Sequence, residues 1–443
     1  MERTGESSVA FVRDGYLFGT RAFERLSTDA FHTRLLGLPT VVMRGEDAAR
    51  FFYEGGRFDR AGAIPKSVSH LLQDERSVQT LEGDAHRRRK ELFLGLLTGP
   101  GEQQLAQAFS AELERTVRSG AGASSIRLID LVDAVLTRAV CSWAGIPDAV
   151  TDDFERTDVL AGMVEHAGDV GPVNWLARVA RRRAERLLVG AVEDARAVPA
   201  SAPPGSALAV IADYREPVWG GEEWLPAEVA AVELLNVLRP TVAVGRFMVF
   251  AAHALHRHPE WKDRLAADDD AADVRSFSNE VRRFYPFFPV IAGRATRECA
   301  WHGHRFRERD RVMLDLYATN HDPAIWPNPR RFHPDRFAGV TVEPNTLIPQ
   351  GGGQYTTGHR CPGEPATLQL LDEAVRWLSQ RLVYVVPPQD LRISLRRFPA
   401  LPEDGFVVSG MSVADHMTRA DHMTVAGQRM GRPPVTATRA PEI

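Results

Sequence analysis

The sequence lacks the marks of several protein classes. It has three cysteines in 443 residues, far apart and without a CxxC pair. Neither a disulfide framework nor a zinc knuckle is therefore expected, and a reducing, cytoplasmic setting fits. No stretch approaches the roughly 18 uninterrupted apolar residues of a membrane span. The polar, acidic start of the chain does not resemble a signal peptide, so none is expected.

The chain also lacks a surplus of positive charge. Its 54 Lys and Arg residues face 58 Asp and Glu residues, for a net charge of −4 at pH 7. Such a balance gives no general attraction to nucleic acid. No Gly-x-Gly-x-x-Gly fingerprint lies in a strand–helix unit, so a reductase would have to be a separate protein. Hydrophobic residues make up 44% of the chain, which is enough for a sizeable core.

The apolar pattern is mostly helical from about residue 65 to 260, and short strands and turns dominate after about residue 285. Strands and helices do not alternate strictly, which predicts one mainly α domain with small β-sheets over residues 1–411. The tail, 412–443, carries an imperfect Ala-Asp-His-Met-Thr repeat and is predicted to be disordered. A metal site at His416 and His422 is disfavoured because no further ligand accompanies them. The helices are expected at 84–98, 101–118, 127–144, 150–166, 174–196 and 226–256.

A glycine-rich, basic loop, 350–364, ends on Cys361 and leads into a helical pattern. A thiol near a helix N-terminus feels free N–H groups and the helix dipole, which both favour the thiolate. The glycines leave a bare backbone that could lie against a flat, wide group, and His359 and Arg360 add positive charge beside the sulfur. Axial ligation of haem suits this pattern. A buried structural cysteine in a surface loop is the alternative.

Two earlier motifs bear on that choice. In the first, Glu280 and Arg283 lie three residues apart on one helix face, where they can pair. In the second, Pro-Asp-Arg-Phe, Arg336 could reach the same pair and complete a buried network. An ordinary surface ion pair is the alternative reading of Glu280 and Arg283.

The ordered set of Glu-x-x-Arg, Pro-Asp-Arg-Phe and a Gly-rich loop with Cys-Pro-Gly resembles the cytochrome P450 superfamily, over about residues 20 to 410. The resemblance implies the mainly α cytochrome P450 fold and haem b as the cofactor. It implies that Cys361 is the axial thiolate ligand of the iron. Glu280, Arg283 and Arg336 would then be structural.

The resemblance also implies residues for the haem propionates. His86 is the first choice, with Lys90 or Arg89 on the same helix face. Arg60 and His359 are further candidates. For the adjacent Arg87 and Arg88, a basic solvated helix end is the alternative.

The long helix predicted at 226–256 departs from the usual pattern of the superfamily. Monooxygenases normally carry an acid–alcohol pair here, whereas this chain has Arg239 and Pro240, with Thr241 beside them. Apolar neighbours predict that Arg239 is buried, where an unpaired guanidinium is costly, and Pro240 opens the helix backbone. A carboxylate ligand would satisfy Arg239 by a bidentate fork. The alternative is a structural pair with an internal acid such as Glu233.

The Asn-Val-Leu-Arg-Pro motif, together with the cysteine loop, resembles the bacterial fatty-acid peroxygenase branch. The resemblance implies hydrogen-peroxide-dependent hydroxylation at the α or β carbon, with the substrate carboxylate on Arg239 serving as general acid and base. Gln79 stands where decarboxylating members carry histidine, so hydroxylation is favoured and decarboxylation to a terminal alkene would be minor. No redox partner would be required.

Phe287, Phe288 and Val290 are candidates to line an apolar acyl channel, although core packing explains each almost as well. Two other functions stay open. One is a dioxygen-dependent monooxygenase fed by a ferredoxin, which would need a proton relay that the sequence does not show. The other is a haem-binding sensor or carrier, although the tail is too short and polar for an output module.

Overall fold

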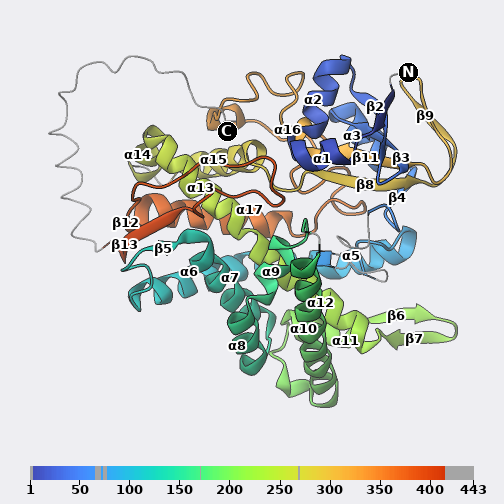
Figure 1. Ribbon diagram of the computed structural model, residues 1–443. Helices are drawn as coiled ribbons and strands as arrows, with labels where there is room; N and C mark the ends of the chain where they lie inside the picture. The colour runs from blue at the N-terminus through green and yellow to red at the C-terminus, as the bar shows by residue number, and fades with distance from the viewer. Residues whose placement is uncertain (1–2, 65–70, 73–76, 170, 268–269, 415–443) are drawn as a thin grey trace, which may run out of the picture.

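The computed structural model describes residues 3–64, 71–72, 77–169, 171–267 and 270–414. A mainly α body fills most of the molecule, and a β-rich lobe lies on one side of it, at the upper right of Figure 1. The prediction of a mainly α protein with small sheets is confirmed. The repeat with His416 and His422 lies outside the described residues.

Most of the helices form the body of the molecule, and a few short ones pack on the β-rich lobe (Figure 1). Among the core helices are α7, α10, α12 and α13, whose inner faces are apolar. The helices are α1 Ser8–Asp14, α2 Leu17–Leu26, α3 Glu46–Tyr53, α5 Gly83–Leu97, α6 Pro100–Arg118, α7 Leu128–Ala144, α8 Asp148–Thr157, α9 Val159–Glu165, α10 Pro172–Ala197, α11 Ala207–Asp213, α12 Ala227–Ala243, α13 Gly245–Arg257, α14 Pro259–Ala267, α15 Ala271–Phe284, α16 Leu316–Asn320 and α17 Glu364–Arg376.

The largest sheet has six strands in the order β1-β2-β3-β11-β8-β4, and a three-stranded sheet has the order β12-β13-β5. Two further hairpins pair β9 with β10 and β6 with β7. The strands are β1 Arg3–Glu6, β2 Ala30–Leu35, β3 Leu38–Met43, β4 Phe58–Asp59, β5 Ile126–Arg127, β6 Arg215–Val218, β7 Gly221–Trp224, β8 Val290–Ala295, β9 Cys299–Trp301, β10 His304–Phe306, β11 Arg311–Asp315, β12 Leu382–Val385 and β13 Val407–Val413.

Three details differ from the sequence-based expectation. The helix predicted at 150–166 is two helices, because Asp158 adopts a left-handed backbone with φ of 48°, which Asp tolerates better than most residues. Strand β13 runs two residues into the predicted tail, where Val413 pairs with Leu382. The basic run over residues 178–186 predicts a solvated helix face, but in α10 its Arg181 is buried and pairs with Glu185.

The helix pair α12–α13 forms the centre of the body. From Val229 to Leu255 every residue is buried except Pro240. Among the described residues this one stretch, Ala227–Arg257, is apolar and long enough to cross a membrane, but 94% of its most apolar window is buried inside the protein. Its composition is therefore that of a core helix.

Candidate haem and carboxylate site

The loop that carries Cys361 is held by its own backbone and by Gln350. The Cys361 N–H donates to the carbonyl of Gln350 at 3.3 Å, and the Gln350 amide nitrogen lies 3.9 Å from Sγ. Gly351 and Gly353 adopt φ values of 93° and 79°, and a Cβ at either position would lie within 3 Å of Tyr53. Glycine is therefore required for the close approach of this loop to α3.

The charges around Cys361 differ from the sequence-based expectation. Burial, followed by the charge of Glu364, raises the pKa of the Cys361 thiol. Glu364 itself is buried, but Arg282 and Arg360 hold its pKa below the ordinary value. Burial therefore opposes the thiolate, whereas the Gly363 N–H, Lys90 and Arg282 favour it, in the direction expected for a helix N-terminus. A metal cation at the sulfur would reverse this balance, because a coordinating thiol is deprotonated outright.

The structure brings together the four side chains predicted for the haem propionates. The rings of His86 and His359 lie 4.0 Å apart, and His359 pairs with Glu82 at 3.0 Å. The backbone N–H of Arg60 donates to the other oxygen of the same carboxylate. Lys90 crosses to the cysteine loop, where it donates to the Gly358 carbonyl and, at 2.7 Å, to that of Arg360.

Burial lowers the pKa values of the basic side chains in this cluster. It lowers the pKa of His86 to about 4, with the charge of His359 as the next cause. It also lowers the pKa of Lys90 to about 8, with Cys361 acting in the opposite direction. Anionic oxygens next to His86 and Lys90 would stabilise the protonated forms of both side chains, since an opposite charge raises the pKa of a cationic group.

Tyr53 adds a donor that the sequence did not reveal. Its hydroxyl is buried without a hydrogen-bond partner within the described structure, and it faces the backbone of the cysteine loop. Arg60 lies over the Tyr53 ring, 5.3 Å from its centroid. An orphaned donor, converging cations and a loop bare of side chains together fit a flat cofactor with carboxylate edges.

The network predicted around Glu280 is confirmed. Both oxygens of Glu280 accept from Arg283, at 2.7 and 2.8 Å, and Arg336 Nε lies 3.0 Å from Oε2. The His333 N–H donates to the same carboxylate at 2.7 Å. Glu280 and Arg283 are fully buried, so the surface-pair alternative is excluded.

Arg239 is buried in the middle of α12, as predicted, with 3% of its surface exposed. It donates to the carbonyls of Leu71 and Leu72, at 3.0 and 2.7 Å, and to the Asn236 amide oxygen at 3.1 Å. All three acceptors are neutral, and no carboxylate of the described residues forms an ion pair with it. Burial, followed by the charge of Arg181, lowers the pKa of Arg239 to about 9.

Glu233 is not the partner of Arg239. It forms a buried ion pair with Arg89 and accepts from the Val78 N–H at 3.0 Å and the Asn236 amide at 2.9 Å. The second end of Arg89 binds Glu216 at 2.5 Å. The alternative of a structural Arg239–Glu233 pair is therefore wrong, since this acid already has a cation of its own.

Gln79 joins the same group of side chains. Its amide oxygen accepts from the Ser77 hydroxyl at 2.5 Å and from the Asn236 amide at 3.2 Å. Asn236 thus touches Gln79, Glu233 and Arg239 at once. Sequence reasoning missed Asn236, although its position three residues before Arg239 places both on one helix face.

Pro240 is the one exposed residue within the buried stretch of α12–α13. Proline has no backbone N–H for the hydrogen bond of a helix interior. The Thr241 hydroxyl donates to the Val237 carbonyl at 2.9 Å. Phe287 stacks on Phe247 of α13, with centroids 4.2 Å apart, while Phe288 is 40% exposed. The acyl-channel role of Phe287, Phe288 and Val290 stays a prediction.

Known proteins resemble this chain over most of its length. The cytochrome P450 family model matches residues 274–370. A solved structure of cytochrome P450SP alpha (CYP152B1) in complex with (R)-ibuprophen is 39% identical, with a TM-score of 0.87, covering 92% of this chain and 99% of that one. Cytochrome P450EX alpha (CYP152N1) with myristic acid is 35% identical, with the same TM-score, covering 94% and 99%.

A variant of cytochrome P450 OleT in complex with arachidonic acid is 29% identical, with a TM-score of 0.87, covering 94% of this chain and 99% of that one. Haem with an axial cysteine thiolate is the cofactor of this fold, and the cysteine loop and its cations fit it. The chain therefore belongs to the cytochrome P450 superfamily, in its fatty-acid peroxygenase branch, and is a haem-thiolate oxidoreductase.

Proposed function

We propose that this enzyme hydroxylates long- or medium-chain fatty acids at the α or β carbon with hydrogen peroxide. The observation that carries the proposal is Arg239, a buried guanidinium whose described acceptors are all neutral. A carboxylate is the ligand that such a cation lacks. Two relatives were solved with fatty acids, P450EX alpha with myristic acid and the OleT variant with arachidonic acid.

Each residue has a defined part in this proposal. Cys361 binds the haem iron, and His86, Lys90, Arg60 and His359 bind the propionates. When bound, haem with a thiolate ligand supplies the cleavage of the O–O bond.

Arg239 holds the substrate carboxylate with its planar fork, so the carbons nearest the head group, α and β, lie closest to the reaction. Pro240 leaves an accessible surface on α12 beside this anchor.

The substrate carboxylate takes the place of the acid that is absent from α12. It accepts a proton from the bound peroxide and returns it to the oxygen that leaves as water. One carbon–hydrogen bond of the fatty acid becomes a carbon–hydroxyl bond, and hydrogen peroxide becomes water, so atoms and electrons balance. The oxygen of the Gln79 amide accepts from Ser77 and Asn236. Because a neutral amide cannot donate a proton as an imidazolium can, Gln79 favours hydroxylation over decarboxylation.

The test is turnover of myristate by the haem-loaded enzyme with hydrogen peroxide alone, with products resolved by mass spectrometry. Arg239→Gln keeps amide donors but removes the charge, and Arg25→Gln at the exposed surface is the matched control. We expect the Arg239 variant to bind myristate about 100-fold more weakly, since a charge-assisted hydrogen bond contributes up to about 3 kcal/mol. Unchanged turnover in Arg239→Gln would refute the proposal, as would activity that requires dioxygen and a ferredoxin.

A further inference from the structure

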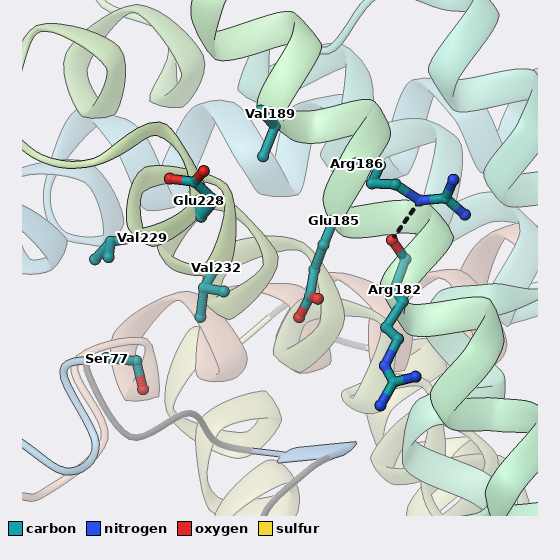
Figure 2. A pocket seen from close by; sticks show the side chains of 8 residues that line it. All are labelled: Ser77, Arg182, Glu185, Arg186, Val189, Glu228, Val229 and Val232. Atoms are coloured by element: carbon teal, nitrogen blue, oxygen red, sulfur yellow. Dashed lines mark hydrogen bonds between the residues drawn. The ribbon is translucent and has the colours of Figure 1, made fainter.

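A cavity of about 550 Å³ lies between α10 and α12. Figure 2 shows side chains of both helices directed into the same space, with Glu185 of α10 facing Val232 of α12. From α10 the cavity is also lined by Arg182 and Arg186, and from α12 by Glu228 and Val229. Arg182, Arg186 and Glu228 are exposed, so this side of the cavity meets solvent.

The α12 wall of this cavity continues to Arg239. Val229, Val232, Asn236 and Arg239 follow one another at steps of three, four and three residues, which places them on one face of the helix. Val229 and Val232 line the cavity, and Asn236 is hydrogen-bonded to Arg239. The cavity and the carboxylate anchor therefore share one helix face, with Asn236 between them.

Two other contacts connect the same places. Ser77 lines the cavity and donates to the Gln79 amide oxygen, which also accepts from Asn236. Glu185, another lining residue, is close enough to Arg239 for its charge to oppose the lowering of the Arg239 pKa. Arg181, which pairs with Glu185 at 2.7 Å, acts on Arg239 in the opposite sense. The shared helix face, the Ser77–Gln79–Asn236 hydrogen bonds and the charge of Glu185 thus connect this cavity with Arg239.

The chemistry of the walls indicates what can pass. The two arginines balance the two glutamates, so the opening attracts neither anions nor cations strongly. An acyl chain would strip water from these charged groups without replacing their hydrogen bonds, which is costly. A small, neutral molecule that both donates and accepts hydrogen bonds can pass without that cost.

We infer that this cavity is the route by which hydrogen peroxide enters the Arg239 site and product water leaves it, apart from the path of the acyl chain. The inference rests on the proposed peroxide-dependent function. Val232 is 9% exposed, lines the cavity and lies on the same helix face as Asn236, one step closer to it than Val229. A bulky side chain at this position would close the route without touching Arg239.

The experiment uses Val232→Trp and, as an independent second variant, Val229→Trp, both loaded with haem and saturated with myristate. Val179→Trp is the matched control, because Val179 lies on α10, is 48% exposed and does not line the cavity. Two rates are measured: association of hydrogen cyanide with the ferric haem, followed by the Soret band, and kcat/KM for hydrogen peroxide.

We expect both rates to fall about tenfold in the two cavity variants, because small-molecule association slows when the protein must first open. Myristate affinity and both rates in the control should not change. Unchanged cyanide and peroxide rates in both cavity variants would overturn the inference. Loss of myristate affinity with intact peroxide kinetics would also overturn it, because the acyl chain would then use this cavity.

The cyanide measurement keeps this inference separate from the proposed function. If the parent enzyme shows no turnover with peroxide, the proposed function fails. The cyanide rates would still decide whether the cavity admits small neutral molecules, since cyanide binds without any turnover.

Discussion

Asn236 is the side chain whose replacement tests the buried network most directly. It is buried, its oxygen accepts from Arg239 at 3.1 Å, and its amide nitrogen donates to Glu233 at 2.9 Å and to Gln79 at 3.2 Å. Asn236→Leu keeps a similar volume and removes all three hydrogen bonds. The variant therefore isolates the polar contribution of one residue.

The expected loss follows from the groups left behind. Two of the three bonds involve charged partners, and each such bond contributes about 1.5–3 kcal/mol. Arg239 keeps the carbonyls of Leu71 and Leu72, and Glu233 keeps Arg89 and the Val78 N–H. We therefore take the lower end for each bond and expect a loss of about 3 kcal/mol in the free energy of unfolding.

Urea unfolding of the haem-loaded protein measures this loss, and Asn236→Asp is the matched comparison. The aspartate keeps an acceptor for Arg239 but places a second carboxylate against Glu233. The like charges raise the pKa of one of them, so protonation favours the folded state and stability falls as the pH rises.

We expect the Asp variant to be less stable at pH 8 than at pH 5. It should also bind myristate more weakly than the Leu variant, because the introduced carboxylate competes for Arg239. A loss below about 1 kcal/mol in Asn236→Leu would refute the reasoning, since one neutral bond alone is worth that much.

Two further predictions concern Arg239 and Gln79. Because burial and Arg181 lower the pKa of Arg239, and only the guanidinium cation holds a carboxylate, myristate affinity should be level across neutral pH and fall at high pH. Spectral titration of the haem band at pH 7.5 and pH 10 measures this, and equal affinities would contradict it. Gln79→His should raise the fraction of terminal alkene among the products, because an imidazolium can donate a proton that the neutral amide cannot. An unchanged ratio by gas chromatography and mass spectrometry would show that Gln79 does not set the outcome.

The sequence predicted most of what depends on local spacing. The Glu280–Arg283 pair follows from a three-residue step on one helix, and the burial of Arg239 follows from its apolar neighbours. The convergence of His86, Lys90, Arg60 and His359 was predicted through the family resemblance rather than from spacing. These residues come from distant segments, and periodicity does not report on contacts between segments.

Contacts over long sequence distances explain what could not be predicted. The Arg89–Glu233 ion pair joins residues 144 positions apart, and either residue alone looks like a charge on an amphipathic helix. The pKa of the Cys361 thiol could not be predicted for a different reason. The sequence showed the helix N-terminus and the nearby cations, which lower this pKa, but it did not show the burial that raises it more. Burial is a property of the packed chain, and here it reverses the sign of a local electrostatic argument.

The buried charged side chains around α12 form one connected chain of contacts. Glu216 and Glu233 bind Arg89, and Asn236 then connects Glu233 to Arg239 by one neutral amide. Because Glu233 is already paired with Arg89, Asn236 fixes the position of Arg239 without an ion pair among the described residues, as the proposed binding of a substrate carboxylate requires. A direct Arg239–Glu233 pair would hold the side chain as firmly but would cancel the charge, and a substrate carboxylate would then have to displace a buried acid at a cost of about 3–5 kcal/mol. Under the proposed function, the amide between them therefore lets one helix hold Arg239 in place while its charge stays available to a substrate carboxylate.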